Sequence, residues 1–487
     1  MTDEPGLSSD VEDALQDHRR GGGNRQGTLV VSDDEGYVGD TIIFKGRNLP
    51  ANERFDIEWY STNGRWGILE GNEVVGPQYA RRTDVLATVE TDESGAFDFQ
   101  WEVQEDYGGS HRIDLKTDDG AVVDRAEFEI RPWFEINRTE APLGETFTIS
   151  GYGIGPNLVT NNYQVSWDNG TIGFMTGVMN RGTATAEIRA VGSPGDHVIE
   201  VWRSYRGFPY LQNNTQSPYG PVGGDRPSRW TVEVTEPETE PETAWIDSQY
   251  EEAPLDIHYP ELDEDTDAEL GIWPQHGQAG TIAFITGSEF PANTEVDLIW
   301  YHHDGHRMPQ GPEESPDLKV APEPRPDVLP TVTTDDDGTF QVEFEIPEAI
   351  GSTRPITAMV DGREVAVTGF MMQPSISSYG PTEGPVGTEI EIDLTGVGWT
   401  NYGNAPVFVY DNKPLGYACG TGGNDGLVRV EIPATGEPGW HFIDVYPSLF
   451  HMRENDPEFE LRAHLSYWDN HPGRPLPAYH FAFKITE

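Results

Sequence analysis

An internal repeat is the feature that most constrains how this chain of 487 residues can fold. The segment VGDTIIFKGRNLPANERFDIEWY (residues 38–60) matches AGTIAFITGSEFPANTEVDLIWY (residues 279–301). Further on, DVLATVETDESGAFDFQWEV (residues 84–103) matches DVLPTVTTDDDGTFQVEFEI (residues 327–346). Self-similarity at a long separation is the sequence signature of a repeated structural unit. We therefore expect two copies of one unit.

The second half of each copy also matches, and it places His197 opposite His441. The unit is therefore larger than a single small domain, and the repeat covers nearly all of the chain. The matching pairs are APLGETFTISGYGI (141–154) with GPVGTEIEIDLTGVGW (384–399), SPGDHVIEVW (193–202) with EPGWHFIDVY (437–446), and WTVEVTE (230–236) with YHFAFKITE (479–487).

Both copies have the pattern of β-strands. Residues 98–103 and 341–346 alternate polar and apolar side chains, which predicts half-buried strands. Turn dipeptides that suit tight hairpins recur between such segments, and no clear helical periodicity is present. Short strands separated by such turns, in blocks of about 100 residues, favour immunoglobulin-like β-sandwiches. The turn dipeptides are Asn63-Gly64, Asp119-Gly120, Asp304-Gly305 and Asp361-Gly362.

The predicted fold is therefore all-β, with four tandem immunoglobulin-like β-sandwich domains arranged as a duplicated two-domain unit. The acidic, Pro-rich linker should be extended by proline and by repulsion between like charges, and Trp245, Ile246 and Tyr250 could dock it onto a domain. The predicted boundaries are a polar flexible tail at 1–27, domain 1 at 28–133, domain 2 at 134–236, the linker at 237–268, domain 3 at 269–375 and domain 4 at 376–487.

One segment carries a family resemblance. PSISSYGPTEGPVGTEIEIDLTGVGW (residues 374–399) resembles the opening of an IPT/TIG-type immunoglobulin-like domain, with its Gly-Pro turn before an alternating strand. TDESGAF (91–97) and TDDDGTF (334–340) resemble hairpins of prokaryotic surface immunoglobulin-like repeats. The first three domains lack the full Gly-Pro turn. The resemblance implies adhesion, spacing or partner binding, and it transfers no active-site residue.

The chain is strongly acidic, with 84 Asp and Glu against 31 Lys and Arg and a net charge of −53. Only five of the basic residues are lysines, and an acidic, lysine-poor globular chain resembles proteins of extreme halophiles. Molar salt shortens the Debye length to about 3 Å, so the self-repulsion is screened there. An ordinary acidic protein and a calcium-loaded surface protein are the alternatives. No basic stripe is present, so nucleic acid is not an expected partner.

The sequence predicts no enzyme. It contains no nucleophile elbow, zincin helix or phosphate-binding loop, although a carboxylate pair of a glycan-active enzyme could be hidden among so many acids. Its single cysteine, Cys419, excludes an intramolecular disulfide. No stretch approaches about 18 apolar residues, so membrane insertion is not expected. Residues 1–27 contain no apolar segment, so no signal peptide is predicted.

Two segments of the sequence could bind cations. His302, His303 and His306 follow the segment ending in Trp300-Tyr301 and could bind a transition metal, or could stand exposed at a hairpin tip. The acidic turn at residues 334–338 could hold Ca²⁺, although such turns form without an ion and nonspecific cation accumulation is the favoured reading. No cofactor is predicted.

Two long loops are the predicted binding surfaces. Residues 203–229 and 447–478 are too long for sandwich turns, and such loops usually carry function. They are rich in aromatic residues and Arg, which are enriched in binding hot spots, although the aromatics could instead pack against a neighbouring domain. The predicted contact residues are Arg203, Tyr205, Arg206, Phe208, Tyr210, Tyr219, Phe450, Arg453, Tyr467, Trp468 and Arg474.

Together these features predict a non-enzymatic structural or adhesive protein of a haloarchaeal virion, as a capsid turret, decoration or tail component. Its location would be the virion, after synthesis in the host cytoplasm. The alternative is a cell-surface or S-layer-associated protein of a halophilic archaeon. The expected partners are protein neighbours in the particle or surface layer, a host glycoprotein or glycan, and further copies of the chain in a homo-oligomer.

Overall fold

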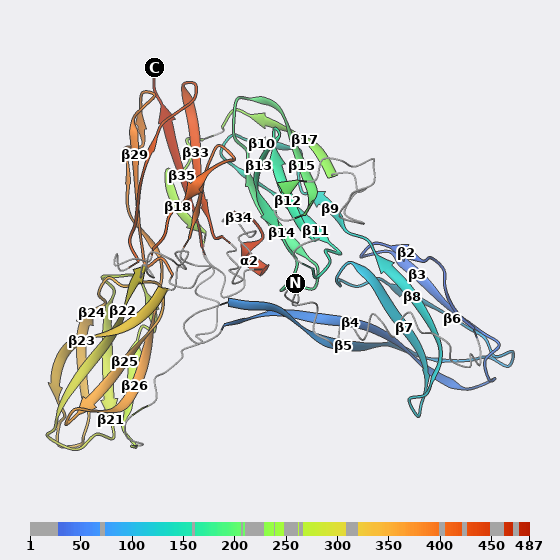
Figure 1. Cartoon of the computed structure of the whole chain (residues 1–487), viewed down its shortest axis with the longest axis horizontal. Coiled ribbons are helices and arrows are strands. Elements are labelled where there is room, and N and C mark those ends of the chain that lie inside the picture. Colours follow the sequence, from blue (N-terminus) through green and yellow to red (C-terminus); the bar gives the residue numbers. More distant parts are fainter. Residues whose placement is uncertain are drawn as a thin grey trace, which may run out of the picture. The chain divides into compact units, whose positions relative to one another are not determined.

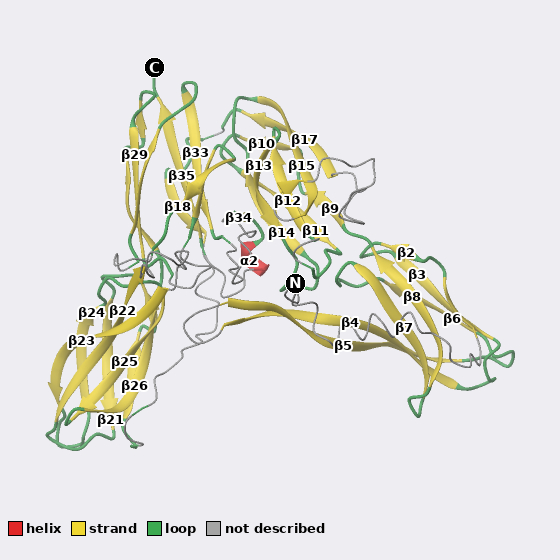
Figure 2. Ribbon diagram, in the orientation of Figure 1, coloured by secondary structure: helices red, strands yellow, loops and turns green. Residues whose placement is uncertain are grey.

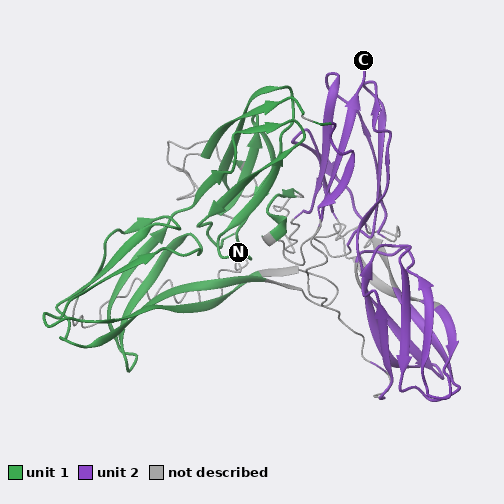
Figure 3. Cartoon of the chain, turned by 180° about the vertical axis from the view of Figure 1, so that it is seen from behind, with its two compact units in different colours: residues 1–68, 74–239, 452–473 green, residues 69–73, 240–451, 474–487 purple. Residues whose placement is uncertain are grey.

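The computed structural model shows a chain built from β-strands, with a single short helix among the residues that it describes (Figures 1 and 2). The chain divides into two compact units (Figure 3). Unit 1 comprises residues 1–68, 74–239 and 452–473, and unit 2 comprises residues 69–73, 240–451 and 474–487. The structure describes residues 28–68, 74–157, 161–205, 208–209, 228–237, 239–247, 262, 266–307, 320–398, 405–420, 426–448, 462–470 and 477–487.

The first part of unit 1 is a β-sandwich. Its core contains Phe44 from one sheet and Trp59 and Phe128 from the other, all buried. A three-stranded sheet has the order β1 (Thr28–Val31), β3 (Thr41–Arg47), β6 (Phe97–Glu102). A five-stranded sheet has the order β2 (Glu35–Gly36), β8 (Val122–Ile130), β7 (Gly109–Thr117), β4 (Arg54–Ile68), β5 (Val74–Glu90).

The second part of unit 1 repeats this plan. Phe147 of the smaller sheet faces Trp167 of the larger one, with ring centroids 6.0 Å apart. The smaller sheet has the order β14 (Ala184–Arg189), β11 (Thr146–Tyr152), β9 (Trp133–Ile136). The larger has the order β10 (Glu140–Pro142), β17 (Ser228–Thr235), β15 (Gly195–Tyr205), β12 (Asn162–Trp167), β13 (Gly170–Met175), β34 (Ala463–His464), with β16 (Phe208–Pro209) paired to β15.

Unit 2 contains the corresponding sheets. Its first core surrounds the buried side chains of Trp300 and Phe370. The smaller sheet has the order β19 (Glu269–Trp273), β21 (Ile282–Ser288), β24 (Phe340–Glu345). The larger has the order β20 (His276–Gly277), β26 (Arg363–Met372), β25 (Ser352–Val360), β22 (Glu295–Arg307), β23 (Val320–Thr333).

The second part of unit 2 has its core around Phe408, Phe481 and Ile392. The smaller sheet has the order β27 (Ser375–Gly380), β29 (Glu389–Thr395), β32 (Val428–Pro433). The larger has the order β18 (Ala244–Asp247), β35 (Ala478–Ile485), β33 (Gly439–Tyr446), β30 (Val407–Tyr410), β31 (Lys413–Tyr417), with β28 (Glu383–Gly384) paired to β35. The all-β, immunoglobulin-like prediction is confirmed by these sheets; the count of four domains and their boundaries stay a prediction.

The sequence repeat is visible as repeated side-chain contacts. Thr91 Oγ1 donates a hydrogen bond of 2.6 Å to Pro50 O in unit 1. The corresponding Thr334 Oγ1 donates one of 2.7 Å to Pro291 O in unit 2. Thr91 follows β5 and Thr334 follows β23. Each hydrogen bond ties that position to the loop before the preceding strand, which is β4 in unit 1 and β22 in unit 2. The matched Thr-Asp-x-x-Gly segments therefore make the same contact in both copies.

Three local expectations need correction. β4 runs through Asn63-Gly64 and β22 runs through Asp304-Gly305, so neither dipeptide forms a turn. In both cases the strand stays paired with a single long neighbour, β5 or β23, beyond the rest of its sheet. Part of the predicted linker is also a strand, because β18 pairs antiparallel with β35. Trp245 of β18 stacks on His480, with centroids 3.9 Å apart, which confirms the suggested docking at that residue.

Candidate functional site

A segment from near the end of the chain completes a sheet in unit 1. β34 and α2 (Tyr467–Asn470) lie between β33 and β35 in the sequence, yet they pack on β13 and β14. We call residues 463–470 the strap. β34 pairs in parallel with β13, with Ala463 opposite Gly173 and His464 opposite Phe174. Addition of an extended segment to an exposed edge is a general mode of protein recognition.

The strap fits β13 closely at two neighbouring positions. A Cβ atom on Gly173 would lie 2.3 Å from the carbonyl oxygen of Ala463, so any larger residue at 173 would collide with the strap backbone. One residue on, the rings of Phe174 and His464 stack with centroids 4.9 Å apart and planes 9° apart. The strap therefore requires a glycine at position 173 of β13, and it stacks on the aromatic ring at position 174.

Two polar side chains anchor the rest of the strap. Ser466 Oγ accepts a hydrogen bond of 3.0 Å from Thr176 N and donates one of 3.0 Å to Thr176 O. Asn470 Oδ1 accepts 3.0 Å from Met179 N, and its Nδ2 donates 3.1 Å to Thr183 O. Both anchoring residues are fully buried. Buried polar groups that lose such partners destabilise a fold, so these bonds specify the position of the strap.

The predicted contact residues of the second long loop lie partly in this strap. Tyr467 is only 4% exposed, and Trp468 is partly buried. The geometry of Tyr467 matches packing onto a neighbouring part of the chain, which was the alternative to partner binding. Phe450, Arg453 and Arg474 lie outside the described residues.

The first long loop begins as regular structure. Arg203 is a partly buried residue of β15, opposite Tyr163 of β12. The backbones of Tyr205 and Phe208 pair with each other across β15 and β16. Arg206, Tyr210 and Tyr219 lie outside the described residues. The structure therefore does not bring the predicted residues of the two loops together as one surface.

The histidine cluster lies within a strand. The backbones of His302, His303 and His306 belong to β22 and pair with β23, so the alternative of a hairpin tip was wrong. Their side chains lie outside the description, and metal binding there stays a prediction. Within the part of the chain that the structure describes, no group of three or more His, Cys, Asp or Glu is placed to hold a metal ion.

In the acidic turn at residues 334–338, the carboxylate of Asp335 accepts hydrogen bonds from neighbouring residues. Asp335 Oδ1 accepts hydrogen bonds of 3.0 Å from Asp337 N and 2.8 Å from Thr339 N, and Oδ2 accepts 2.8 Å from Thr339 Oγ1. The bonds from Thr339 are the main reason that the pKa of Asp335 lies below its usual range. The carboxylate therefore closes the turn by itself.

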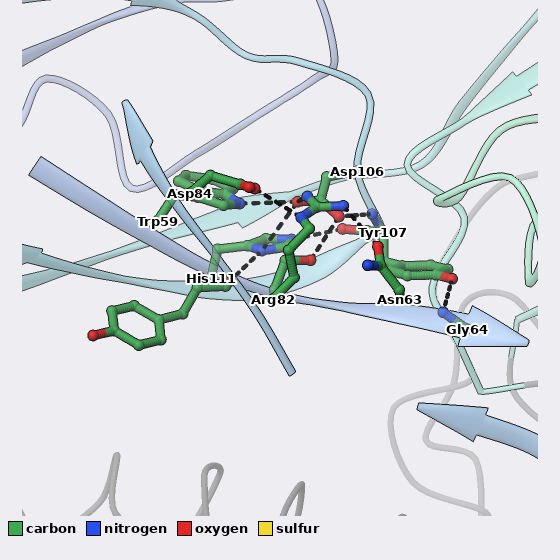
Figure 4. Close-up of polar contacts among 10 residues, drawn as sticks. Trp59, Asn63, Gly64, Arg82, Asp84, Asp106, Tyr107 and His111 are labelled. Atoms are coloured by element: carbon green, nitrogen blue, oxygen red, sulfur yellow. Dashed lines mark hydrogen bonds and ion pairs between the residues drawn. The ribbon is translucent and has the colours of Figure 1, made fainter. Parts of the chain in front are cut away.

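A buried carboxylate organises the first sandwich of unit 1 (Figure 4). Asp106 is 3% exposed and accepts hydrogen bonds from Trp59 Nε1 at 2.9 Å, Ser61 Oγ at 2.6 Å and Arg82 Nη2 at 2.6 Å. Tyr107 N donates a further bond of 2.9 Å. Because four donors occupy the two oxygens, this carboxylate is an anchor that joins β4, β5 and the segment before β7.

Unit 2 has different residues at the positions that correspond to Asp106 and His111. The pairing of Trp59 with Ile113 and of Trp300 with Ile356 aligns the two copies, so Asp106 corresponds to Ala349. The same alignment places Arg354 at the position of His111. Arg354 is fully buried, and its Nη2 donates bonds of 2.8 Å to the carbonyls of Ile350 and Gly351. Both units therefore have a buried charged side chain that holds this segment by hydrogen bonds, but it is an aspartate in unit 1 and an arginine in unit 2.

Beside this anchor, the two sandwiches of unit 1 meet at a close joint. A Cβ atom on Gly108 would lie 1.9 Å from the carbonyl oxygen of Gly153. Tyr107 Oη accepts 2.8 Å from Gly64 N and donates 2.6 Å to Val178 O (Figure 4 shows the bond to Gly64). Burial raises the pKa of Tyr107 to about 12, so the phenol stays protonated and able to donate.

Unit 2 contains the same joint. A Cβ atom on Gly351 would lie 2.2 Å from the carbonyl oxygen of Gly396. Gly351 N also donates a hydrogen bond of 3.1 Å to Val397 O. Val397 N in turn donates one of 3.1 Å to Gly426 O. Backbone in direct contact leaves little room for two sandwiches to rotate against each other. Each unit therefore contains a close backbone contact between its two sandwiches, which we call the elbow.

The matched histidines fasten hairpin turns. His441 Nδ1 lies 2.6 Å from Asp411 Oδ2, and Nε2 lies 2.8 Å from Glu437 O. His197 makes the same contacts, 2.6 Å to Asp168 and 2.8 Å to Ser193 O. Burial opposes protonation of His441, but the hydrogen bond and charge of Asp411 outweigh it, and the pKa of His441 is raised above its usual value.

Sequence reasoning missed Asp106 and the strap anchors Ser466 and Asn470. No local motif marks Asp106; only the comparison with Ala349 in the other copy singles it out. The strap was signalled by the length of its loop, although nothing in the loop indicated which surface it would cover.

No protein-family model and no curated protein matches the chain. Among solved structures, α2-macroglobulin of E. coli has a TM-score of 0.18 at 9% identity, covering 93% of this chain and 31% of that chain. The D1–D4 ectodomain fragment of ICAM-5 has a TM-score of 0.17 at 11% identity, covering 90% of this chain and 99% of that fragment. A putative membrane-anchored protein of Corynebacterium diphtheriae has 0.18 at 10%, covering 71% and 91%.

The chain thus spans about a third of the length of that α2-macroglobulin. The scores are too low to carry information about function, and the fold is assigned from the sheets themselves. Among the described residues, no helix is long and apolar enough to cross a membrane.

Proposed function

We propose that this chain is a non-enzymatic structural and adhesive protein, which holds surface loops at set positions on a particle or cell. The observation that carries the proposal is the elbow found in both units, where Gly108 meets Gly153 and Gly351 meets Gly396 backbone to backbone. A duplicated unit with a fixed internal angle acts as a spacer, because loops at its ends keep their separation.

The acidic, lysine-poor composition supports a surface that works in strong salt, where a net charge of −53 is screened. Among such surfaces we place a haloarchaeal virion first, with the chain as a capsid turret, decoration or tail component that contacts neighbouring subunits or the host surface. A cell-surface or S-layer-associated protein is the second candidate.

Mass spectrometry of purified particles and of cell envelopes from the source organism tests this proposal. A virion component should be abundant in particles that have been freed of membrane by density centrifugation. Abundance in the envelope with absence from particles would replace the first candidate by the second. Absence from both fractions would contradict the surface function altogether.

A further inference from the structure

β31 in unit 2 forms an exposed sheet edge. It pairs with β30 on one side, and within the described part of the chain no strand pairs with its other side. All of its residues are exposed, including the large side chains of Leu415 and Tyr417, each 54% exposed. Native proteins usually protect such edges, because unpaired backbone groups invite another strand.

β31 is the repeat equivalent of β13, the strand that binds the strap. Both follow a turn of Asp and Asn with positive φ, Asp168-Asn169 before β13 and Asp411-Asn412 before β31. Both also carry a register shift in their pairing with the preceding strand. Gly173 lies opposite Val165, and Gly416 lies opposite the corresponding Phe408. Gly416 and Tyr417 therefore occupy the positions of Gly173 and Phe174.

The two strands differ in what covers them. Phe174 is 3% exposed beneath the strap, whereas Tyr417 is 54% exposed. A Cβ on Gly173 would strike Ala463, whereas a Cβ on Gly416 would meet nothing within 4 Å. Glycine weakens a strand and often marks a place where another backbone approaches. In this chain Gly416 has the residue type for such an approach, but the described residues contain no approaching strand.

We propose that the outer edge of β31 binds a strand from a second copy of this chain, as β13 binds the strap. The repeat indicates this occupant. The edge in the first half is filled by a segment from the loop before the last strand of the second half. The corresponding edge in the second half has no such segment among the described residues, and a second copy of the chain brings further halves that can supply one.

The other features of β31 agree with this pairing. Lys413 and Pro414 protect the first part of the strand, since charge and the missing amide of proline disfavour pairing there. The strap ladder on β13 involves only Gly173 and Phe174, whose equivalents lie beyond Pro414. Tyr417 also offers a ring where Phe174 stacks on His464. The unprotected part of β31 therefore corresponds to the part of β13 that pairs with the strap.

Sedimentation velocity of the full-length chain in molar salt, over a range of concentrations, tests the proposal. Wild type should self-associate. Gly416→Val should raise the dissociation constant at least about tenfold, because its side chain fits the free edge and blocks the incoming backbone. Leu415→Asp should do the same through desolvated charge. Val85→Asp is the matched control on another exposed strand residue, 56% exposed, and should associate like wild type.

Circular dichroism of each variant establishes that it is folded before its association is compared, and Leu415→Asp decides the question if Gly416→Val is unfolded. A wild-type chain that remains monomeric at every concentration would overturn the proposal. So would folded β31 variants that associate as tightly as wild type, or a Val85→Asp chain that is weakened as much. The experiment uses the purified chain alone, so its outcome is independent of whether the protein comes from a virion or a cell surface.

Discussion

The carbonyl oxygen of Ala463 lies 2.3 Å from the position that a Cβ atom on Gly173 would occupy. These two residues are far apart in the sequence, and their contact completes a sheet of unit 1 with a segment that interrupts the last strands of unit 2. The size of residue 173 therefore controls whether the strap can stay bound.

Gly173→Val should displace the strap and lower the free energy of unfolding of unit 1 by about 1–3 kcal/mol, the usual cost of overpacking a buried site. Chemical unfolding in molar salt measures this change. Gly416→Val is the matched control, because its Cβ meets open space within the chain, and at concentrations where the chain is monomeric it should leave stability unchanged or slightly higher. Equal losses in the two variants would show that the strap contact is not the cause.

Asp106→Asn should destabilise the first sandwich of unit 1 by about 3 kcal/mol, because it leaves the largely buried guanidinium of Arg82 with only the half-exposed Asp84 as a charged partner. The side chains of Arg82 and Asp106 are 13% and 4% exposed. Asp84→Asn removes the other partner of Arg82, which is 46% exposed, and should cost below about 1 kcal/mol. Thermal unfolding compares the two, and a larger loss for Asp84→Asn would be evidence against the anchor role of Asp106.

The stability of unit 2 should depend on pH through His441. Its pKa in the folded chain is raised above the ordinary value of 6.5. Its contribution is therefore complete below the unfolded pKa and is lost as pH rises through the folded pKa. The free energy of unfolding should fall as the pH rises from about 6.5 through the raised folded pKa of His441, and His441→Gln should flatten that part of the curve. Parallel curves for the two proteins would contradict this assignment.

Salt should stabilise the whole chain. The net charge of −53 makes each compact unit repel itself, and only a short Debye length removes that cost. The melting temperature should fall when the protein is dialysed below about 1 M salt. A melting temperature that is unchanged there would contradict adaptation to brine.

Much of the fold was predictable because the repeat compares the chain with itself. Pairs such as Thr91 and Thr334, or His197 and His441, make the same contacts in both copies, so their matching in the sequence reported real constraints. Alternating residues predicted the strands because a sandwich buries one face of each sheet. The turns predicted at Asn63-Gly64 and Asp304-Gly305 were wrong, since pairing with β5 and β23 overrides the local turn preference.

The candidate site was less predictable, because its residues recognise distant parts of the chain. Ser466 and Asn470 carry no motif, and their role exists only against the backbone of Thr176 and Met179. The length of the loop predicted their neighbours Tyr467 and Trp468 as contact residues, but length alone does not distinguish an exposed side chain from one packed inside the chain. Differences between the copies, such as Asp106 against Ala349, would have been the better signal.

Hydrogen–deuterium exchange of the full-length chain in molar salt tests the central claim, that the strap completes the β13 edge. The amides of Leu465 and Asn470 donate hydrogen bonds of 2.8 Å to Phe174 O and 3.1 Å to Ser466 O. A peptide covering residues 462–470 should therefore exchange slowly in wild type and quickly in Gly173→Val. Exchange of this peptide at the rate of an unfolded chain in the wild type, while β12 and β15 remain protected, would contradict the account.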